Sequence, residues 1–91
     1  MPTISIFFGI TIRMYYRDHA PPHFHAVYAE HEAQVSIATG EIIEEKQSRV
    51  AVRLVREWCE LHRHDLMENW RKREDGMPFE RIPGLDAVQG D

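Results

Sequence analysis

The sequence predicts an α+β domain in which an antiparallel β-meander of three to five strands packs on one long C-terminal amphipathic helix. Two observations carry this prediction. Apolar and polar residues alternate with period 2 through most of residues 3–45, which is typical of half-buried strands. From residue 48 to about residue 74 the apolar period becomes helical, and no Gly or Pro interrupts it. Neither the sheet face nor the helix stripe can bury itself alone, so the two must pack together.

The predicted strands follow one another along the first half of the chain. Gly9 interrupts the first alternating run, so we expect a bulge or bend there. Residues 18–22 connect the second and third strands, because two consecutive prolines cannot donate hydrogen bonds to a sheet. Residues 30–32 are expected to form a polar turn, and Thr39-Gly40 another. The predicted strands cover residues 3–8, 10–17, 23–29, 33–38 and 41–45, the last as a short acidic edge strand.

The helix, in one or two pieces, is expected to begin at Ser48, a residue type that caps helix N-termini well, and to end before Gly76. With 91 residues the chain can bury one modest core, so we predict a single domain over residues 1–85 and a disordered tail over residues 86–91. The apolar stripe of the helix is predicted to contain Val50, Ala51, Leu54, Val55, Trp58, Cys59, Leu61, His62, Leu66 and Trp70.

Composition excludes several classes of protein. The chain has 11 Lys and Arg against 15 Asp and Glu, and this net charge of −4 gives no general attraction for nucleic acid. A single Cys excludes an intrachain disulfide and any zinc finger built on cysteines. No run approaches the roughly 18 apolar residues that a membrane span needs. We therefore expect a cytoplasmic protein that does not interact with membranes.

The most unusual stretch is His19-Ala20-Pro21-Pro22-His23-Phe24-His25, which holds three of the six histidines. His23 and His25 are two residues apart on a predicted strand, so their side chains leave the same face of the sheet. Phe24 between them points toward the core. The histidine pair is therefore expected to face outward.

A hairpin across the Pro-Pro connection would bring further polar residues beside this pair. In the expected register, Arg17 lies opposite His23, Tyr15 lies opposite His25, and Arg13 lies opposite Val27. The predicted outward face groups Arg13, Tyr15, Arg17, His23 and His25, with Gln34 and Ser36 one strand away.

Three functions fit these residues. The first is a metal-independent ribonuclease that uses His23 and His25 as acid and base while arginine holds the phosphate of RNA. The second is a divalent metal site for Zn or Ni, in which His19, Asp18 or His31 completes the ligands of His23 and His25. The third is a surface that binds a protein partner. A purely structural interpretation also stands, in which outward histidines follow a rigid turn and do nothing else.

Two polar residues lie on the apolar side of the predicted helix. His62 is most simply a buried histidine whose hydrogen bonds are satisfied by the sheet or a loop. The functional alternative is that His62 and Asn69 reach the loop at residues 18–22 and orient it. Cys59 is expected to be a buried structural thiol.

Motifs along most of the chain resemble a small prokaryotic domain-of-unknown-function family. The family is recognised by a His-X-Pro-Pro-His-Phe-His signature, and the likeness covers about residues 2–85. The segments that carry it are Phe7-Phe8-Gly9-Ile10, Ile12-Arg13-Met14-Tyr15, residues 18–26, Glu57-Trp58, Glu60-Leu61-His62 and Glu68-Asn69-Trp70.

The resemblance implies a short stand-alone cytoplasmic protein, often encoded beside a second very small protein in an arrangement similar to a toxin–antitoxin pair. It brings no established catalytic residues. The matched motifs contain Asp18, His19, His23, His25, His62 and Asn69. We therefore predict a binding or regulatory module that acts through the His/Arg/Tyr face on a small protein encoded by an adjacent gene. The ribonuclease and the metal site remain alternatives, and the open sheet face also suggests a homodimer.

Overall fold

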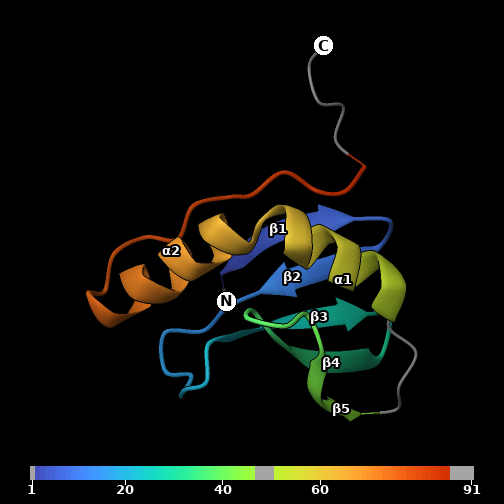
Figure 1. The fold of residues 1–91 in the computed structure, drawn as a ribbon, viewed down its shortest axis with the longest axis horizontal. Coiled ribbons are helices and arrows are strands. Elements are labelled where there is room, and N and C mark those ends of the chain that lie inside the picture. Colours follow the sequence, from blue (N-terminus) through green and yellow to red (C-terminus); the bar gives the residue numbers. More distant parts are fainter. Residues whose placement is uncertain (1, 47–50, 87–91) are drawn as a thin grey trace.

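Five antiparallel strands form one meander sheet in the computed structural model, which describes residues 2–46 and 51–86 (Figure 1). The strands lie in the order β1-β2-β3-β4-β5, so each pairs with its neighbour in sequence. Two helices follow the sheet and cover one of its faces. The predicted α+β class and the antiparallel meander are therefore confirmed. The elements are β1 (Thr3–Phe7), β2 (Ile10–Arg13), β3 (His23–Tyr28), β4 (His31–Ser36), β5 (Ile42–Lys46), α1 (Val52–Leu61) and α2 (Arg63–Glu74).

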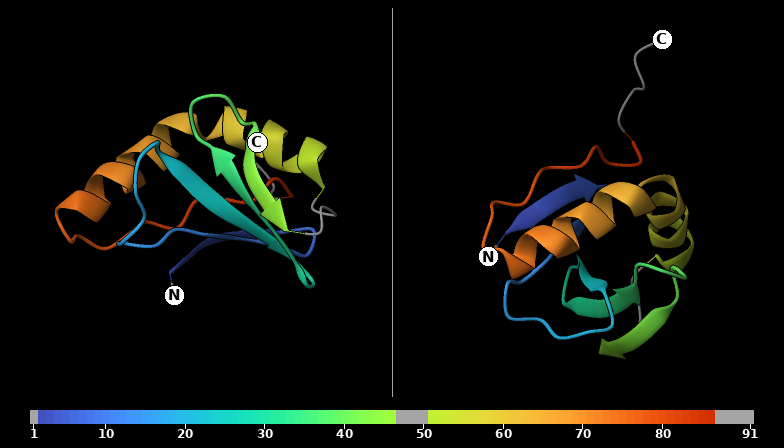
Figure 2. Two further views of the ribbon diagram at one scale, coloured as in Figure 1. Left: turned by 90° about the horizontal axis from the view of Figure 1, so that it is seen from below. Right: turned by 60° about the vertical axis from the view of Figure 1, so that its left-hand side comes forward.

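The helical segment forms two helices and not one long helix, because the chain changes direction at His62. The backbone of His62 has φ −120° and ψ 24°, which lies outside the helical region. Its N–H donates to the carbonyls of Trp58 and Cys59 at 3.1 and 3.3 Å, and this closes the last turn of α1. The break lets α1 lie over the sheet while α2 extends past the strand ends, beside residues 14–22 (Figures 1 and 2). The predicted N-cap at Ser48 lies outside the described residues.

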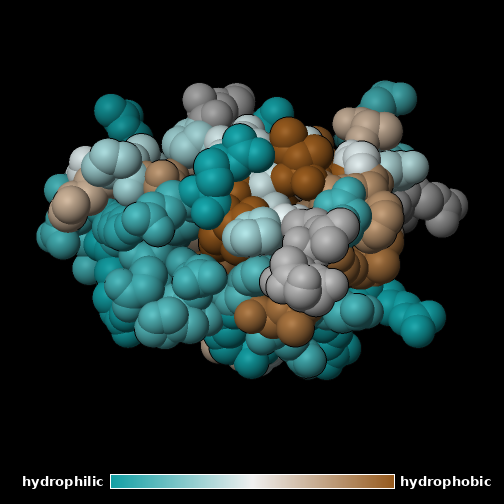
Figure 3. All heavy atoms as spheres, turned by 90° about the horizontal axis from the view of Figure 1, so that it is seen from above, coloured by the Kyte–Doolittle hydropathy of each residue, from teal (hydrophilic) through white to brown (hydrophobic). Residues whose placement is uncertain are grey.

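The core lies between the inner face of the sheet and the helices. Trp58 is fully buried at its centre, with its ring centroid 5.2 Å from that of Phe7 and 5.6 Å from that of Phe24. Val55, Cys59, Leu66 and Trp70 of the predicted stripe are also buried. Leu61 does not follow the prediction, because it precedes the break and is 67% exposed. Hydrophilic side chains dominate the outer surface at the α2 end of the molecule (Figure 3).

Alternation fails in β1 because the strand carries an irregularity. Its pairing with β2 shifts between Thr3 and Ser5, which inserts one extra residue and reverses the side-chain parity. Ile4 and Phe7 are therefore both buried, although the alternating pattern placed Ile4 with Ile6 and Phe8. The bulge or bend expected at Gly9 is a tight hairpin turn between β1 and β2.

Phe8 and Gly9 have φ values of 50° and 79°, the left-handed conformation that a two-residue hairpin turn requires. The chain differs from the sequence expectation at two further positions. The turn expected at residues 30–32 lies at Ala29-Glu30, where Ala29 has φ 54°, and His31 already belongs to β4. Strand β2 ends at Arg13 rather than at residue 17, so the connection to β3 covers residues 14–22.

The segment after α2 returns along β1 and is held by specific hydrogen bonds. The Ile82 N–H donates to the Ile4 carbonyl at 2.8 Å, and the Trp58 indole N–H donates to the Pro83 carbonyl at 2.8 Å. A Cβ on Gly84 would lie 2.8 Å from the Ile6 carbonyl oxygen, so the close approach requires glycine. Apart from Asp86, the predicted disordered tail at residues 86–91 lies outside the described residues.

Neither helix in the described part of the chain is long and apolar enough to cross a membrane.

Candidate metal centre

Strand β3 places His23 and His25 on the face opposite to Phe24, as the alternation predicts. The register with β2 differs from the expected one by two residues, because Arg13 pairs with His25. A shift of two keeps every side chain on its predicted face. On the other side of β3, Gln34 pairs with His25 and Ser36 pairs with His23, which confirms these predicted neighbours.

The two histidines do not face solvent, contrary to the prediction. Each residue is only 6% exposed. Residues 14–22 fold back over this end of the sheet, and the Tyr15 ring meets the His25 ring edge-on at 4.6 Å. The Trp70 ring of α2 lies 5.4 Å from the His23 ring. Alternation predicts the face of the sheet on which the histidines lie, but it does not predict that residues 14–22 cover that face.

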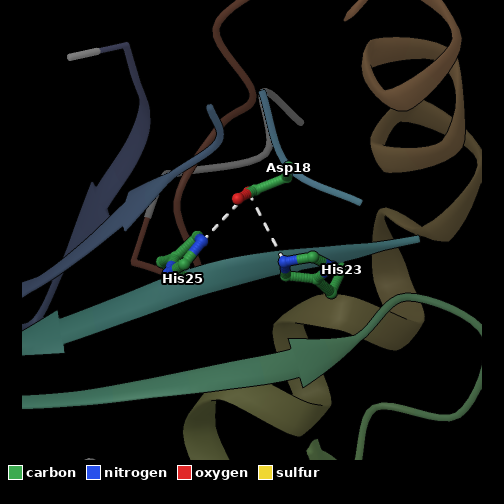
Figure 4. Close-up of side chains that lie close together, drawn as sticks. All are labelled: Asp18, His23 and His25. Atoms are coloured by element: carbon green, nitrogen blue, oxygen red, sulfur yellow. Dashed lines mark hydrogen bonds and ion pairs between the residues drawn. The ribbon is translucent and has the colours of Figure 1, made fainter. Parts of the chain in front are cut away.

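The loop carries Asp18 to a point between the two imidazole rings (Figure 4). Its Oδ2 atom lies 3.0 Å from His25 Nε2 and 3.4 Å from His23 Nε2. One oxygen and two nitrogens that can each bind a metal thus lie within 4.8 Å of one another. The Asp18 side chain is 19% exposed, so the cluster is shielded but not sealed.

The second nitrogen of each imidazole is held by an acceptor. His23 Nδ1 lies 2.7 Å from the Pro21 carbonyl oxygen, and His25 Nδ1 lies 2.9 Å from Glu32 Oε2. A carbonyl and a carboxylate only accept hydrogen bonds, so each Nδ1 must donate its proton. Both rings then direct Nε2 toward Asp18. This orientation is the usual one for a metal-ligating histidine, whose other nitrogen donates to a carbonyl or carboxylate.

Helix α2 and the C-terminal segment fix the loop that carries Asp18. The Arg73 guanidinium donates to the Asp18 carbonyl at 2.9 Å and lies over the Trp70 ring, 3.9 Å from its centroid. The Tyr16 hydroxyl donates to the Met77 carbonyl at 2.8 Å, and its ring stacks on Phe79. Sequence reasoning did not assign Glu32, Trp70 or Arg73 to the site. No local signal could have found Arg73, because its partner is 55 residues away in sequence.

The other predicted site residues do not join the cluster of ligand atoms. Asp18, and not His19, lies beside the histidine pair; His19 and Arg17 are exposed on the loop. His31 is also outside the cluster. Arg13 is half-buried opposite His25, and its Nε atom is buried without a hydrogen-bond partner among the described residues.

The proposed contact of His62 and Asn69 with the loop at residues 18–22 is wrong. The Asn69 side chain is buried and bonds the backbone of Glu80 twice, donating to its carbonyl at 3.0 Å and accepting from its N–H at 2.9 Å. His62 packs against Trp58, with ring centroids 5.5 Å apart, and its Nδ1 lies 3.8 Å from an Asp65 oxygen. Both residues therefore stabilise the fold away from the cluster.

Comparison with known proteins identifies the family of the chain. The family described as Domain of unknown function (DUF4160) matches residues 9–71, well over half of the chain. The matched residues include the three of the cluster, together with Glu32 and Trp70. No curated protein and no solved structure matches the chain. The chain belongs to the domain-of-unknown-function family DUF4160.

Proposed function

We propose that Asp18, His23 and His25 bind one divalent transition-metal ion. The observation that carries this proposal is the direction of the two imidazoles. Both Nδ1 atoms are engaged by acceptors, and both Nε2 atoms point at the same carboxylate oxygen. Two imidazoles and one carboxylate are ligand types that such an ion accepts.

Proton counting supports a cation in the cluster. A neutral imidazole that donates from Nδ1 has a lone pair at Nε2, and the Asp18 carboxylate also offers lone pairs. Without a cation, each contact of Asp18 Oδ2 with an Nε2 atom, at 3.0 and 3.4 Å, brings two lone pairs together unless a further proton lies between them. One metal ion bound to Asp18, His23 and His25 satisfies all three groups at once.

The distances and the donor types also fit a transition metal. Bonds of about 2.0–2.1 Å to nitrogen and oxygen place adjacent ligand atoms about 3 Å apart. The two separations from Asp18 Oδ2, 3.0 and 3.4 Å, agree with this value, and all three ligand atoms lie within 4.8 Å of one another. Two imidazoles with one carboxylate suit Zn, Fe, Co or Ni, whereas Mg and Ca prefer sets made only of oxygen ligands.

The burial of the histidines favours metal binding over the ribonuclease. Their side chains are only 7% and 8% exposed, whereas an acid and a base that cleave RNA must both reach the phosphodiester. A single ion needs far less access than an RNA strand. The ribonuclease therefore stays as the weaker alternative.

Metal titration of purified untagged protein tests the proposal. We expect the protein to bind Zn²⁺ or Co²⁺ with one ion per chain, and a hundredfold excess over Kd to stabilise the fold by about 2.7 kcal/mol. Asp18→Ala and the double change His23→Ala/His25→Ala should abolish both effects. His19→Ala is the matched control, because His19 is an exposed histidine on the same loop. A wild-type protein that binds neither ion, with an unchanged melting temperature, would rule the centre out.

We also propose that the protein works as a binding module for a small protein encoded by an adjacent gene, as the resemblance implies. Ile6 and Phe8, each 54% exposed beside the β1–β2 turn, favour a protein contact. Co-expression with the neighbouring gene product tests this role, with Ile6→Ser/Phe8→Ser expected to lose the complex and Leu61→Ser as the control. Recovery of a homodimer alone would favour self-association instead.

A further inference from the structure

A metal ion held by Asp18, His23 and His25 would keep at least one open coordination position, because transition metals take four or more ligands. The ligand that fills this position is set by the groups around it. The group to consider is the Arg13 guanidinium, which takes part in none of the hydrogen bonds or ion pairs described so far.

Arg13 lies directly beside the centre. It is the last residue of β2 and pairs with His25 across the two strands. Facing residues of an antiparallel pair leave the same side of the sheet with Cβ atoms roughly 5 Å apart. Arg13 is therefore the cross-strand neighbour of a proposed metal ligand, on the face that carries the cluster.

Within the described ranges, the charge of Arg13 has no partner. No carboxylate among residues 2–46 and 51–86 forms an ion pair with it, and its buried Nε atom makes no hydrogen bond there. The Glu32 carboxylate holds His25, and the Glu44 carboxylate accepts from Gln34. A buried donor left unpaired costs about 1–3 kcal/mol, so a bound acceptor would be favourable.

We propose that the centre takes a small oxyanion, a carboxylate or a phosphate group, which binds the metal through one oxygen and accepts hydrogen bonds from Arg13. This inference rests on the proposed metal centre. Asp18 neutralises only half the charge of a divalent ion, and the guanidinium adds a second positive group. The planar fork of Arg13 matches the paired oxygens of such an anion. The shielding of Asp18, at 19% exposure, restricts the ligand to a small molecule or a protruding group.

The test uses Co²⁺ as the probe, because its visible absorption changes when its ligands change. Wild-type protein loaded with Co²⁺ is titrated with acetate, with inorganic phosphate and with chloride as the reference anion. We expect a saturable change with acetate or phosphate, and the stronger of the two identifies the source of the oxyanion. Arg13→Gln should bind Co²⁺ with the wild-type affinity but bind the oxyanion about tenfold or more weakly.

Two further variants keep the result interpretable. Arg13→Lys keeps the charge without the planar fork and should recover only part of the response. Arg17→Gln removes an exposed charge on the loop and should respond as the wild type does. If Co²⁺ binds but neither oxyanion alters its spectrum, or if Arg13→Gln responds like the wild type, the inference is wrong. If wild-type protein does not bind Co²⁺, the metal centre itself fails, and the oxyanion site fails with it.

Discussion

Two irregular segments, residues 14–22 and residues 75–86, meet where Tyr16 contacts Met77 and Phe79, and both are bonded to α2. They are held by different chemistry. The C-terminal segment is held by neutral hydrogen bonds between Asn69 and Glu80, Trp58 and Pro83, and Ile82 and Ile4, besides one ion pair of Lys72 with the exposed Glu80 side chain. Nothing further is needed to complete these contacts.

In the loop at residues 14–22, only some of the polar groups have favourable partners. Its backbone is fixed by Arg73 and its Tyr16 side chain by Met77, but its Asp18 carboxylate faces the Nε2 atoms of two imidazoles. That contact needs protons or a metal ion to become favourable. The comparison teaches that one segment is a permanent part of the fold, whereas the other depends on what binds to it.

The largest expected effect is on the C-terminal segment. Asn69→Ala removes two hydrogen bonds and leaves the backbone N–H and carbonyl of Glu80 without partners. We expect the free energy of unfolding to fall by about 2–3 kcal/mol. The loss should be equal in EDTA and in saturating Zn²⁺. Urea unfolding in both conditions measures this loss. A loss seen only with metal would mean that the C-terminal segment also depends on metal, contrary to the comparison.

The next effect concerns the loop and should depend on metal. Glu32→Ala removes the acceptor that orients His25, so we expect metal affinity to fall about tenfold to hundredfold. Stability without metal should change by less than about 1 kcal/mol, because the Glu32 side chain is 44% exposed. Isothermal titration with Zn²⁺ measures the affinity. Glu30→Ala, an exposed carboxylate in the preceding turn, is the control and should bind Zn²⁺ as the wild type does.

Regular elements were predicted correctly from the sequence, whereas irregularities within them were not. Period 2 gave the correct face for His23 and His25 because β3 is regular over its whole length. It failed in β1, where a register shift after Thr3 reversed the parity, and alternation carries no signal for such an insertion. The helical period correctly predicted the buried stripe that contains Trp58 and Leu66. It did not place the break at His62, because no Gly or Pro marks that position.

The site was predictable only where local geometry decides it. The spacing of His23 and His25 fixes their common face, and it made a metal site one of the open alternatives. The third ligand depends on where the loop folds, and that is decided by contacts distant in sequence such as Arg73 with the Asp18 carbonyl. Helical periodicity assigns Arg73 to a charged face, and only the packing of α2 beside the loop reveals its role.

The smallest expected effect concerns Cys59. Its thiol hydrogen bonds go to the carbonyls of Ser36 and Ile37 and not to residues 14–22 or 75–86, so it provides a reference for both segments. Burial raises the pKa of the Cys59 thiol, and the nearby Arg63 guanidinium opposes this only in part. The thiol points at the Ile37 carbonyl, 3.6 Å away, and is fully buried. In the folded protein it therefore stays protonated to a higher pH than in the unfolded chain.

The sign of the pH dependence follows from this difference. An unfolded thiol ionises near pH 8.5, so the stability due to the neutral Cys59 is fully present below that pH and is lost as the pH rises through the folded pKa. In EDTA, the unfolding free energy of wild-type protein should fall more steeply above about pH 8.5 than that of Cys59→Ala. Cys59→Ala lowers stability at every pH through the lost packing, so the difference in slope alone reports the thiol. Equal slopes would mean that Cys59 ionises as easily in the folded as in the unfolded protein.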